Sequence, residues 1–447
     1  MASESLYFIW LSCALGYASA AVKPLFDRFG DALSIYEASE EDYAEISELC
    51  AAERRNLANK DLERAEEIAG YCLHGGIRLL KLTDEDYPAA LREIKNPPVL
   101  LYCRGRLPDW NRLPCIGVVG ARAMSYYGAD AACEIAYDLG RMGCITVSGM
   151  ALGIDGVAAA ATLEAGAPTV AVLGSGIDRI YPAAHKTLYK AILEKGGAVI
   201  TEFAPYEGAD GFHFPLRNRV ISGIAKAIIL VEGDASSGAL ITARYAKRQG
   251  KGVFAVPGKI GDLNSEAPHL LLKGEGKLLT CADDIYDTYK EEYFSTINPF
   301  NLLPRAEISV DDVIRRYAIA KGDAKKKEKK LLNQRKGAKK EGVFGKIRSL
   351  VGGEKKEDVE KIKQKQEENA RQKDADRRER LDEERKRSLS PKTYRVYEKL
   401  NYETALHPDE ITVTGLSVGE VVSELISMEI SGAATLLPGG RYLKSEL

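Results

Sequence analysis

Three glycine-rich segments each follow an apolar run of this chain, and their residue types suit the binding of an anion. Glycine lets a backbone approach a ligand closely, and free N–H groups at the start of a helix attract negative charge. The candidate phosphate-binding residues in these segments are Gly120, Arg122, Ser125, Ser148, Gly149, Gly153, Gly174 and Gly176. Tight turns before helices also need glycine for structural reasons, so the segments predict an anion site without identifying the ligand.

A second pattern, FHFPLRNRVISG at residues 212–223, places two arginines beside a predicted helix start. Pro215 favours the first turn of a helix, so the sequence predicts Arg217, Asn218 and Arg219 in that turn. The helix dipole disfavours cations there, and a bound anion would offset that cost. An exposed or ion-paired couple of arginines is the structural alternative. Phe212 and Phe214 either stack on a ligand or pack in the core.

A further turn of small residues, SSGALIT at residues 236–242, leads into another predicted helix. Its Ser237, Gly238 and Thr242 suit phosphate or sugar hydroxyl groups.

Motifs that would indicate common nucleotide enzymes are missing. The sequence holds no GxxxxGK[ST], and the first predicted strand–helix turn reads GARAMS instead of GxGxxG. Asp155, Asp178 and Glu202 are the candidate general acids or bases, but the first two stand at predicted helix starts, where carboxylates often act as caps. Eight cysteines and five histidines are dispersed without metal-ligand spacing. We expect a non-catalytic protein without a metal or cofactor; a nucleotide-processing enzyme or nucleotide sensor is the alternative.

Six short apolar runs alternate with longer helical segments in the middle of the chain. The predicted strands are residues 115–120, 144–149, 169–174, 198–202, 227–233 and 252–258, and helices are expected over 128–142 and 240–249. Strands that are apolar throughout and joined by helices indicate a parallel sheet covered on both faces. The predicted fold class is α/β, a doubly wound Rossmann-like domain, in which ligands bind beyond the carboxyl ends of the strands.

Composition divides the chain into four expected parts. Residues 1–88 are predicted to form a small helical, SAM-like domain, and residues 89–292 the extended Rossmann-like domain. Residues 293–389 are an expected charged linker, partly disordered or helical, because 321–387 hold 25 Lys and Arg against 15 Asp and Glu. Three short helices and a hairpin around residues 438–440 predict a winged-helix domain over 390–447.

The overall charge does not show whether the protein binds nucleic acid, and the hydrophobicity pattern gives no sign of a membrane span. The formal net charge is -2, so a nucleic-acid partner has to be inferred from local sites. No apolar run approaches the roughly 20 residues that a membrane span needs, and the apolar start at 6–15 lacks a basic preceding region. We therefore expect a cytoplasmic protein with no membrane partner.

Five motifs in this order resemble the DNA-processing protein A family (DprA, also called Smf). They are GARAMSYYG, SGMALGID, VLGSGIDRIYP, FHFPLRNRVISG, and SSGALITA followed by VFAVPG. The resemblance implies a protein that binds single-stranded DNA, protects incoming strands during natural transformation and loads the RecA recombinase. It also implies a homodimer formed through the α/β domain.

The same resemblance implies roles for particular residues. Carried onto this sequence, the DNA contacts of the family fall on Arg122, Lys186, Arg217, Asn218 and Arg219. The C-terminal segment SVGEVVSELISME is acidic and has no Lys or Arg to contact bases or phosphates, so a transcription regulator is disfavoured. We expect that domain to contact a protein or to have a structural role.

Overall fold

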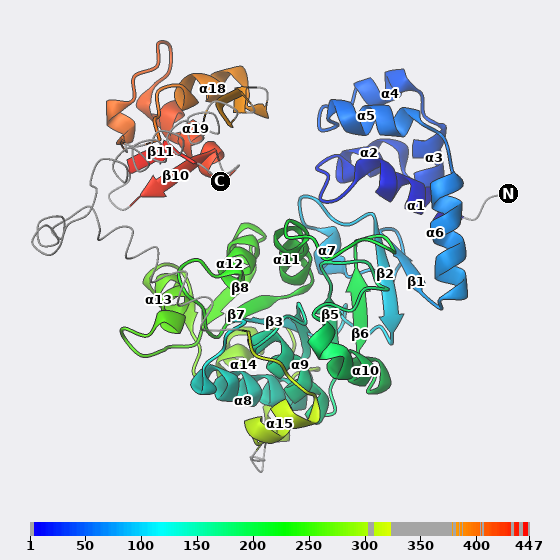
Figure 1. The fold of residues 1–447 in the computed structure, drawn as a ribbon, viewed down its shortest axis with the longest axis vertical. Helices are drawn as coiled ribbons and strands as arrows, with labels where there is room; N and C mark the ends of the chain where they lie inside the picture. Colours follow the sequence, from blue (N-terminus) through cyan, green and yellow to red (C-terminus); the bar gives the residue numbers. More distant parts are fainter. Residues whose placement is uncertain are drawn as a thin grey trace, which may run out of the picture. The chain divides into compact units, whose positions relative to one another are not determined.

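The computed structural model describes two compact units, divided between residues 334 and 335. The described residues are 4–302, 308–322, 378, 381–383, 385–386, 388–402, 404, 406–430, 433–437 and 441–445. The elements are labelled as in Figure 1.

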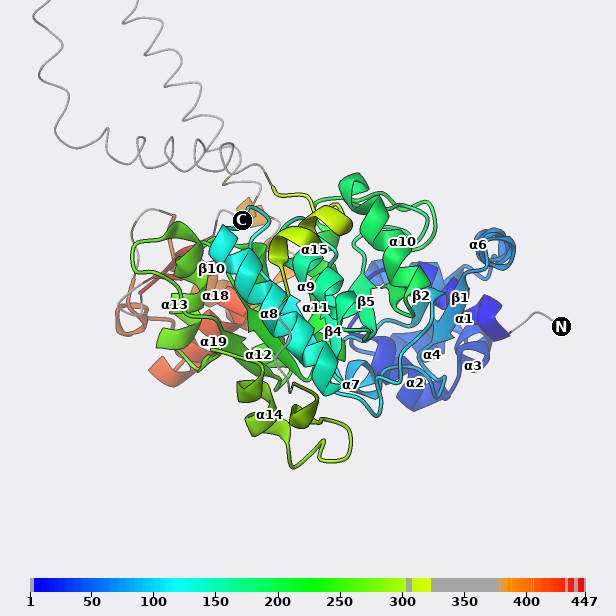
Figure 2. The ribbon, with the colours of Figure 1, turned by 90° about the horizontal axis from the view of Figure 1, so that it is seen from below.

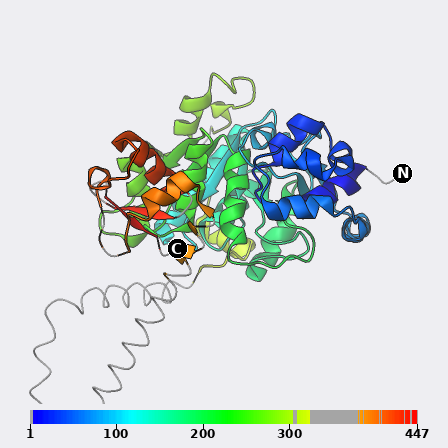
Figure 3. The ribbon, with the colours of Figure 1, turned by 90° about the horizontal axis from the view of Figure 1, so that it is seen from above.

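The first unit begins with a group of helices packed around the apolar helix α1. These are α1 (Glu4–Leu15), α2 (Val22–Phe29), α3 (Ala32–Glu37), α4 (Glu40–Ala44), α5 (Ala51–Ala58) and α6 (Glu63–His74). Helix α1 contacts α3, α5 and α6, and its Trp10 ring lies 5.0 Å from that of Tyr36. This group lies at one end of the sheet, where α1 contacts β1 and β2 (Figure 3, blue).

A nine-stranded sheet forms the centre of this unit. Its strands are β1 (Arg78–Lys81), β2 (Leu100–Gly105), β3 (Cys115–Val119), β4 (Ile145–Ser148), β5 (Thr169–Val172), β6 (Ala198–Thr201), β7 (Ala227–Leu230), β8 (Gly252–Ala255) and β9 (Lys277–Leu278). The order is β1-β2-β6-β5-β4-β3-β7-β8-β9. All pairs among strands β3 to β9 are parallel, whereas β2 pairs antiparallel with β6 and with β1.

The sheet confirms the six predicted strands and extends the prediction in two ways. The run PVLLYCRG at residues 98–105 also predicts a short strand, which is β2. Strand β2 pairs antiparallel with β6 and with β1, so the sheet is mixed and not wholly parallel. Strand β1 already belongs to this sheet, so the helical part of the chain ends before residue 88. The signal for β1 was weak because its four residues RLLK do not alternate clearly between apolar and polar.

Helices cover both faces of the sheet, as a doubly wound fold requires. One face carries α8 (Tyr126–Met142), α9 (Ile154–Glu164), α10 (Lys186–Glu194) and α15 (Val310–Arg316) (Figure 2). The other carries α7 (Ala89–Arg92), α11 (His213–Ile224) and α12 (Gly238–Arg248). Helices α13 (Glu266–Lys273) and α14 (Asp283–Tyr289) follow at the end near β8 and β9.

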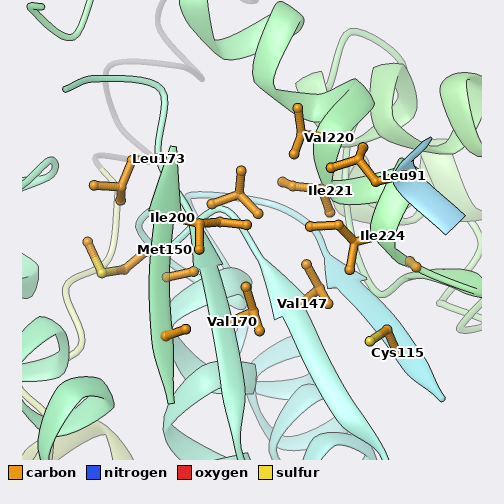
Figure 4. Packing of buried hydrophobic residues seen from close by; sticks show 14 of the residues in the cluster. Leu91, Cys115, Val147, Met150, Val170, Leu173, Ile200, Val220, Ile221 and Ile224 are labelled. Carbon is orange, nitrogen blue, oxygen red and sulfur yellow. The ribbon is translucent and has the colours of Figure 1, made fainter. Parts of the chain in front are cut away.

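Apolar side chains hold α11 against the sheet. Figure 4 shows Val147, Val170 and Ile200 from three neighbouring strands facing Val220, Ile221 and Ile224 of α11. All six are at most 3% exposed, and burying such a side chain contributes about 1.5–3 kcal/mol. This packing fixes the helix that carries the RNR sequence.

Glycine also brings α7 close to α11. A Cβ at Gly223 would lie 2.5 Å from Cδ1 of Leu91, so a larger residue there would force the Leu91 side chain to move.

The compact unit continues beyond the predicted boundary at residue 292. Helix α15 packs on α8 and α9, with Val310 and Val313 buried. Val310 and Val313 are spaced so that both lie on the buried face of α15. The charged residues around this helix led to the prediction of a linker. Most of the predicted linker, from residue 323 to 377, lies outside the described residues.

The second unit contains α18 (Pro391–Tyr397), α19 (Val418–Ile430) and the antiparallel strands β10 (Ala434–Leu437) and β11 (Arg441–Lys444). The predicted turn at 438–440 lies outside the described residues, and the winged-helix assignment stays a prediction. Asp382, upstream of the predicted boundary at 390, accepts hydrogen bonds from the hydroxyls of Tyr397 and Tyr402 and from Nζ of Lys444. The folded module therefore includes residues before 390.

Within the described parts of the chain, no helix is long and apolar enough to cross a membrane.

Candidate functional site

A cleft of about 960 Å³ opens beyond the carboxyl ends of the parallel strands. It lies beside the neighbouring strands β3 and β7, whose following helices α8 and α12 cover opposite faces of the sheet. Such a topological switch point is where open α/β sheets bind ligands. Seven predicted site residues line the cleft: Gly120, Arg122, Arg217, Asn218, Ser237, Gly238 and Thr242.

A small cavity of about 30 Å³ adjoins the same arginines. It is lined by Gly149 and Gly174 together with Arg122 and Arg217. The remaining predicted residues line neither space: Ser125, Ser148, Gly153, Gly176, Lys186 and Arg219.

Two arginines converge on one aromatic ring in the cleft. The guanidinium carbons of Arg122 and Arg217 lie 5.5 Å and 5.9 Å from the centroid of the Phe214 ring. The Tyr181 ring lies 5.3 Å from the Phe214 ring and also lines the cleft. Gly174 makes room for this ring, because a Cβ there would approach Phe214 Cδ1 to 2.9 Å.

Arg217 is almost fully buried and is held by backbone carbonyls. Its Nη1 donates to the carbonyl oxygen of Gly149, at 2.9 Å, and to that of Val172. Its Nε donates to the Asn218 side chain at 3.2 Å. Burial lowers the pKa of Arg217 to about 10, and Asp155 opposes this fall. The side chain still carries its charge at neutral pH.

The helix that carries Arg217 begins earlier than predicted. Helix α11 starts at His213, not at Pro215, so Arg217 lies in its second turn. The unfavourable first-turn position inferred from the sequence is therefore wrong, and the cost of placing this cation comes from burial.

Side chains of the protein already occupy several loop donors that were expected to bind phosphate. At the start of α8, the Glu232 carboxylate accepts from the N–H and the hydroxyl of Ser125. After β4, the Asp155 carboxylate accepts from the N–H of Gly149 at 2.9 Å. These donors are therefore not free, whereas Arg122 and Arg217 place cationic groups in the lining of the cleft.

Three of the predicted residues shape the loops and do not face the cleft. Gly153 has φ of 77°, and a Cβ there would lie 2.3 Å from the Ala121 carbonyl oxygen. A Cβ at Gly176 would lie 2.6 Å from the Ala204 carbonyl oxygen. The Ser148 hydroxyl donates within its own loop, to the Asp155 carbonyl at 3.3 Å.

Arg219 does not contribute to the cleft, in contrast to the prediction. Two residues after Arg217 on a helix, it points about 200° away around the axis. It is fully buried, and its Nη2 contacts both carboxylate oxygens of Glu202. The ion-paired alternative is therefore correct for Arg219, and Glu202 is engaged as its partner.

Lys186 and Phe212 are exposed but line neither space. Sequence reasoning missed Tyr181 and Gly322, which do line the cleft. Tyr181 stands in the IYP run quoted for the resemblance, which was a usable signal. Gly322 had none, because it lies 200 residues from Arg122 and reaches the cleft only through tertiary packing.

The helical part of the unit supports one wall of the cleft. The loop between β6 and α11 supplies Ala209 and Gly211 to the lining. Its Tyr206 ring lies 4.6 Å from Tyr71 of α6, and Phe203 lies 4.6 Å from Tyr17. The helices thereby brace the segment that leads into α11.

Among the described residues, no three His, Cys, Asp or Glu side chains are grouped to hold a metal ion.

The sheet order, the switch-point cleft and its paired arginines define a Rossmann-like α/β protein with a cationic cleft, and comparison with known proteins shows its family. Residues 78–290 match the family described as DNA recombination-mediator protein A. The chain is 40% identical over 204 residues to the DNA processing protein DprA of Streptococcus pneumoniae, covering 46% of this chain and 71% of that protein. The chain belongs to the DprA/Smf family.

Two further likenesses define the extent of the match. The chain is 39% identical over 209 residues to Protein Smf of Escherichia coli, covering 47% of this chain but only 56% of that protein. The X-ray structure of DprA from Streptococcus pneumoniae aligns with a TM-score of 0.55 at 32% identity, covering 63% of this chain and 97% of that one. The shared region is thus centred on the α/β domain.

Proposed function

We propose that the cleft binds single-stranded DNA and that the protein acts without catalysis, protecting strands and passing them to a recombinase during natural transformation. The observation that carries this proposal is the convergence of Arg122 and Arg217 on the Phe214 ring. Membership of a family described by DNA recombination supports DNA as the ligand.

The arrangement suits a chain of alternating phosphates and bases. Guanidinium groups bind phosphate oxygens through paired charge-assisted hydrogen bonds. An aromatic ring offers a face to any base, and such stacking contributes about 1–3 kcal/mol per base. Arg122 is exposed at the cleft, so it is available to a phosphate while Phe214 and Tyr181 face a neighbouring base.

A single strand fits this cleft better than a duplex. Phe214 and Tyr181 line the walls of the cleft, so we expect that a base has to leave a stack to reach them. Paired bases in a duplex cannot do so without the cost of unstacking. We therefore expect preference for single strands without strong sequence selectivity.

The positions of the acidic residues favour binding over nucleotide processing. Of the three candidate acids, only Asp155 lines the cleft, and the Gly149 N–H holds its carboxylate. Burial raises the pKa of Asp155, although Arg217 and this N–H oppose the rise. Turnover of nucleoside monophosphates or signalling nucleotides by the purified protein would favour the enzyme alternative.

A salt series with a labelled oligonucleotide tests the DNA assignment. Arg122→Ala should weaken binding and reduce the slope of log K against log salt by about 0.7, the value for one lost phosphate contact on a single strand. Arg244→Ala is the matched control, because Arg244 is an exposed arginine on α12 that does not line the cleft. Unchanged affinity and slope in Arg122→Ala would overturn the assignment.

Delivery to RecA and self-association are further parts of the proposal. Strand β9 stands at the sheet edge, with Leu278 and the nearby Leu270 more than half exposed, which supports a homodimer through the α/β domain. Sedimentation of wild type and Leu278→Glu tests the dimer.

RecA assembly on oligonucleotide in the presence of this protein tests delivery.

A further inference from the structure

A short segment outside the family match crosses two loops of the cleft. Residues 317–322, here called the strap, follow α15, and Ala318 turns the chain with φ of 52°. The N–H of Gly153 donates to the Ala320 carbonyl at 3.0 Å. The N–H of Gly322 donates to the Arg122 carbonyl at 2.8 Å, and Gly322 lines the cleft.

The beginning of the strap is fixed to α9 and α10. The hydroxyl of Tyr317 and the guanidinium of Arg316 both contact Glu164 at the end of α9. Lys195 joins them, 3.1 Å from the same carboxylate and 2.6 Å from the Tyr317 hydroxyl. Although burial opposes it, these hydrogen bonds lower the pKa of Glu164.

His185 links the strap to the loop after β4. It is fully buried, with Nε2 3.1 Å from the Ala320 nitrogen and Nδ1 3.1 Å from the Met150 carbonyl oxygen. The neutral ring with its proton on Nδ1 satisfies both groups. Gly156 makes room, because a Cβ there would lie 2.7 Å from His185 Cε1.

We propose that the strap and His185 are positioning elements of the DNA cleft. The strap holds the backbone of Arg122 from one side, while Phe214 contacts its side chain. Because the loop is already fixed in the free protein, binding a strand would cost less conformational entropy at Arg122. This inference rests on the proposed single-strand binding, and the strap lies beyond the matched residues 78–290.

Gly322→Val tests the strap at its contact with the loop. A Cβ at Gly322 would lie 3.0 Å from the Arg122 carbonyl carbon and 3.2 Å from the Ala123 nitrogen, both backbone atoms that cannot rotate away. Gly70→Val is the matched control, because a Cβ at Gly70 in α6 meets nothing within 4 Å. Both variants are made in the full chain, and their folding is compared by circular dichroism.

The readout is the affinity for labelled oligo-dT over a salt series. Gly322→Val should bind about tenfold more weakly, as for one lost charge-assisted contact, and its salt slope should fall by about 0.7. The double variant with Arg122→Ala should bind no more weakly than Arg122→Ala alone, since the strap acts through Arg122. Additive losses, or wild-type affinity in Gly322→Val, would overturn the inference.

Substitutions of His185 give an independent arm if Gly322→Val unfolds. His185→Leu should reproduce the non-additive loss, and His185→Gln should restore binding, because an amide both donates and accepts. Equal loss in both variants would contradict the positioning role. If Arg122→Ala binds normally, the proposed function fails; if only the strap variants bind normally, this inference alone fails.

Discussion

The Asp155 carboxylate accepts a hydrogen bond from the backbone N–H of Gly149 at 2.9 Å. Backbone N–H groups in glycine-rich turns can bind phosphate, but this one already donates to a carboxylate of the protein. The Glu232 carboxylate takes the same role toward Ser125 at the start of α8. With these donors occupied, Arg122 and Arg217 are the cationic side chains that line the cleft.

Replacing Phe214 should separate base stacking from phosphate contact. Phe214→Leu should weaken binding by about 1–3 kcal/mol, the range for one base stacked on an aromatic ring. The loss should disappear with an oligonucleotide of abasic sites, whose phosphates are unchanged. Phe212→Leu is the control, because Phe212 is exposed and outside the cleft. An equal loss with abasic oligonucleotide would rule out stacking on Phe214.

Breaking the buried ion pair should destabilise the first unit. Arg219→Met leaves the Glu202 carboxylate 5% exposed and without its cation, which costs about 3–5 kcal/mol in comparable cases. Urea unfolding measures the change in free energy. Asp86→Asn, which breaks the exposed pair with Arg78, should cost less than about 1 kcal/mol. Similar losses for both variants would contradict the importance of burial.

Acidification should weaken folding through His185. Burial lowers the pKa of His185 below its ordinary value of 6.5, although hydrogen bonds and Asp155 oppose the shift. The unfolded chain therefore binds a proton more readily than the folded one as the pH falls below 6.5, and stability is lost. Melting temperatures between pH 7 and 5.5 should fall less steeply in His185→Gln than in wild type.

The control for this pH dependence is His74→Gln, because His74 is exposed. Glu164 has a lowered pKa and loses its contribution only near and below its ordinary value of 4.5, outside this window. An identical pH slope in wild type and His185→Gln would refute the prediction.

Asp382 should be required for a stable C-terminal module. Asp382→Asn removes the charge that pairs with Lys444, whose side chain is 11% exposed, and weakens hydrogen bonds from Tyr397 and Tyr402. We expect a loss of about 1–3 kcal/mol, as for a buried charged partner left unpaired. Limited proteolysis of the full chain should show faster cleavage after residue 390. Asp409→Asn, at an exposed position, should cleave like wild type.

Much of the central fold could be predicted because its signals are local. Uninterrupted apolar runs such as Ala227–Leu230 mark strands buried on both faces, and the alternating helices fix a parallel sheet. The sequence did not reveal β1, β9 or the folded part beyond 292, because their positions depend on contacts with distant segments.

The site could be predicted only at the level of segments. The loops after the strands were located correctly, and Arg122 and Arg217 line the cleft. Which of two arginines spaced by two residues faces the ligand depends on helix phase, and the helix start was misplaced by two residues. The contact of Glu232 with Ser125 could not be read from the sequence, because the two residues lie 107 positions apart. The hydrogen bond that Asp155 accepts from its own loop agrees with the capping role expected beside a predicted helix start.

The strap determines where the chain that follows residue 322 leaves the first unit. Because Gly322 lines the cleft and is bonded to the Arg122 loop, the chain that follows it starts beside the proposed strand-binding site. Any protein captured by the C-terminal module would thus experience a raised local concentration of the bound strand, set by the chain length between them. For the proposed delivery of a strand to a recombinase, transfer would then be intramolecular.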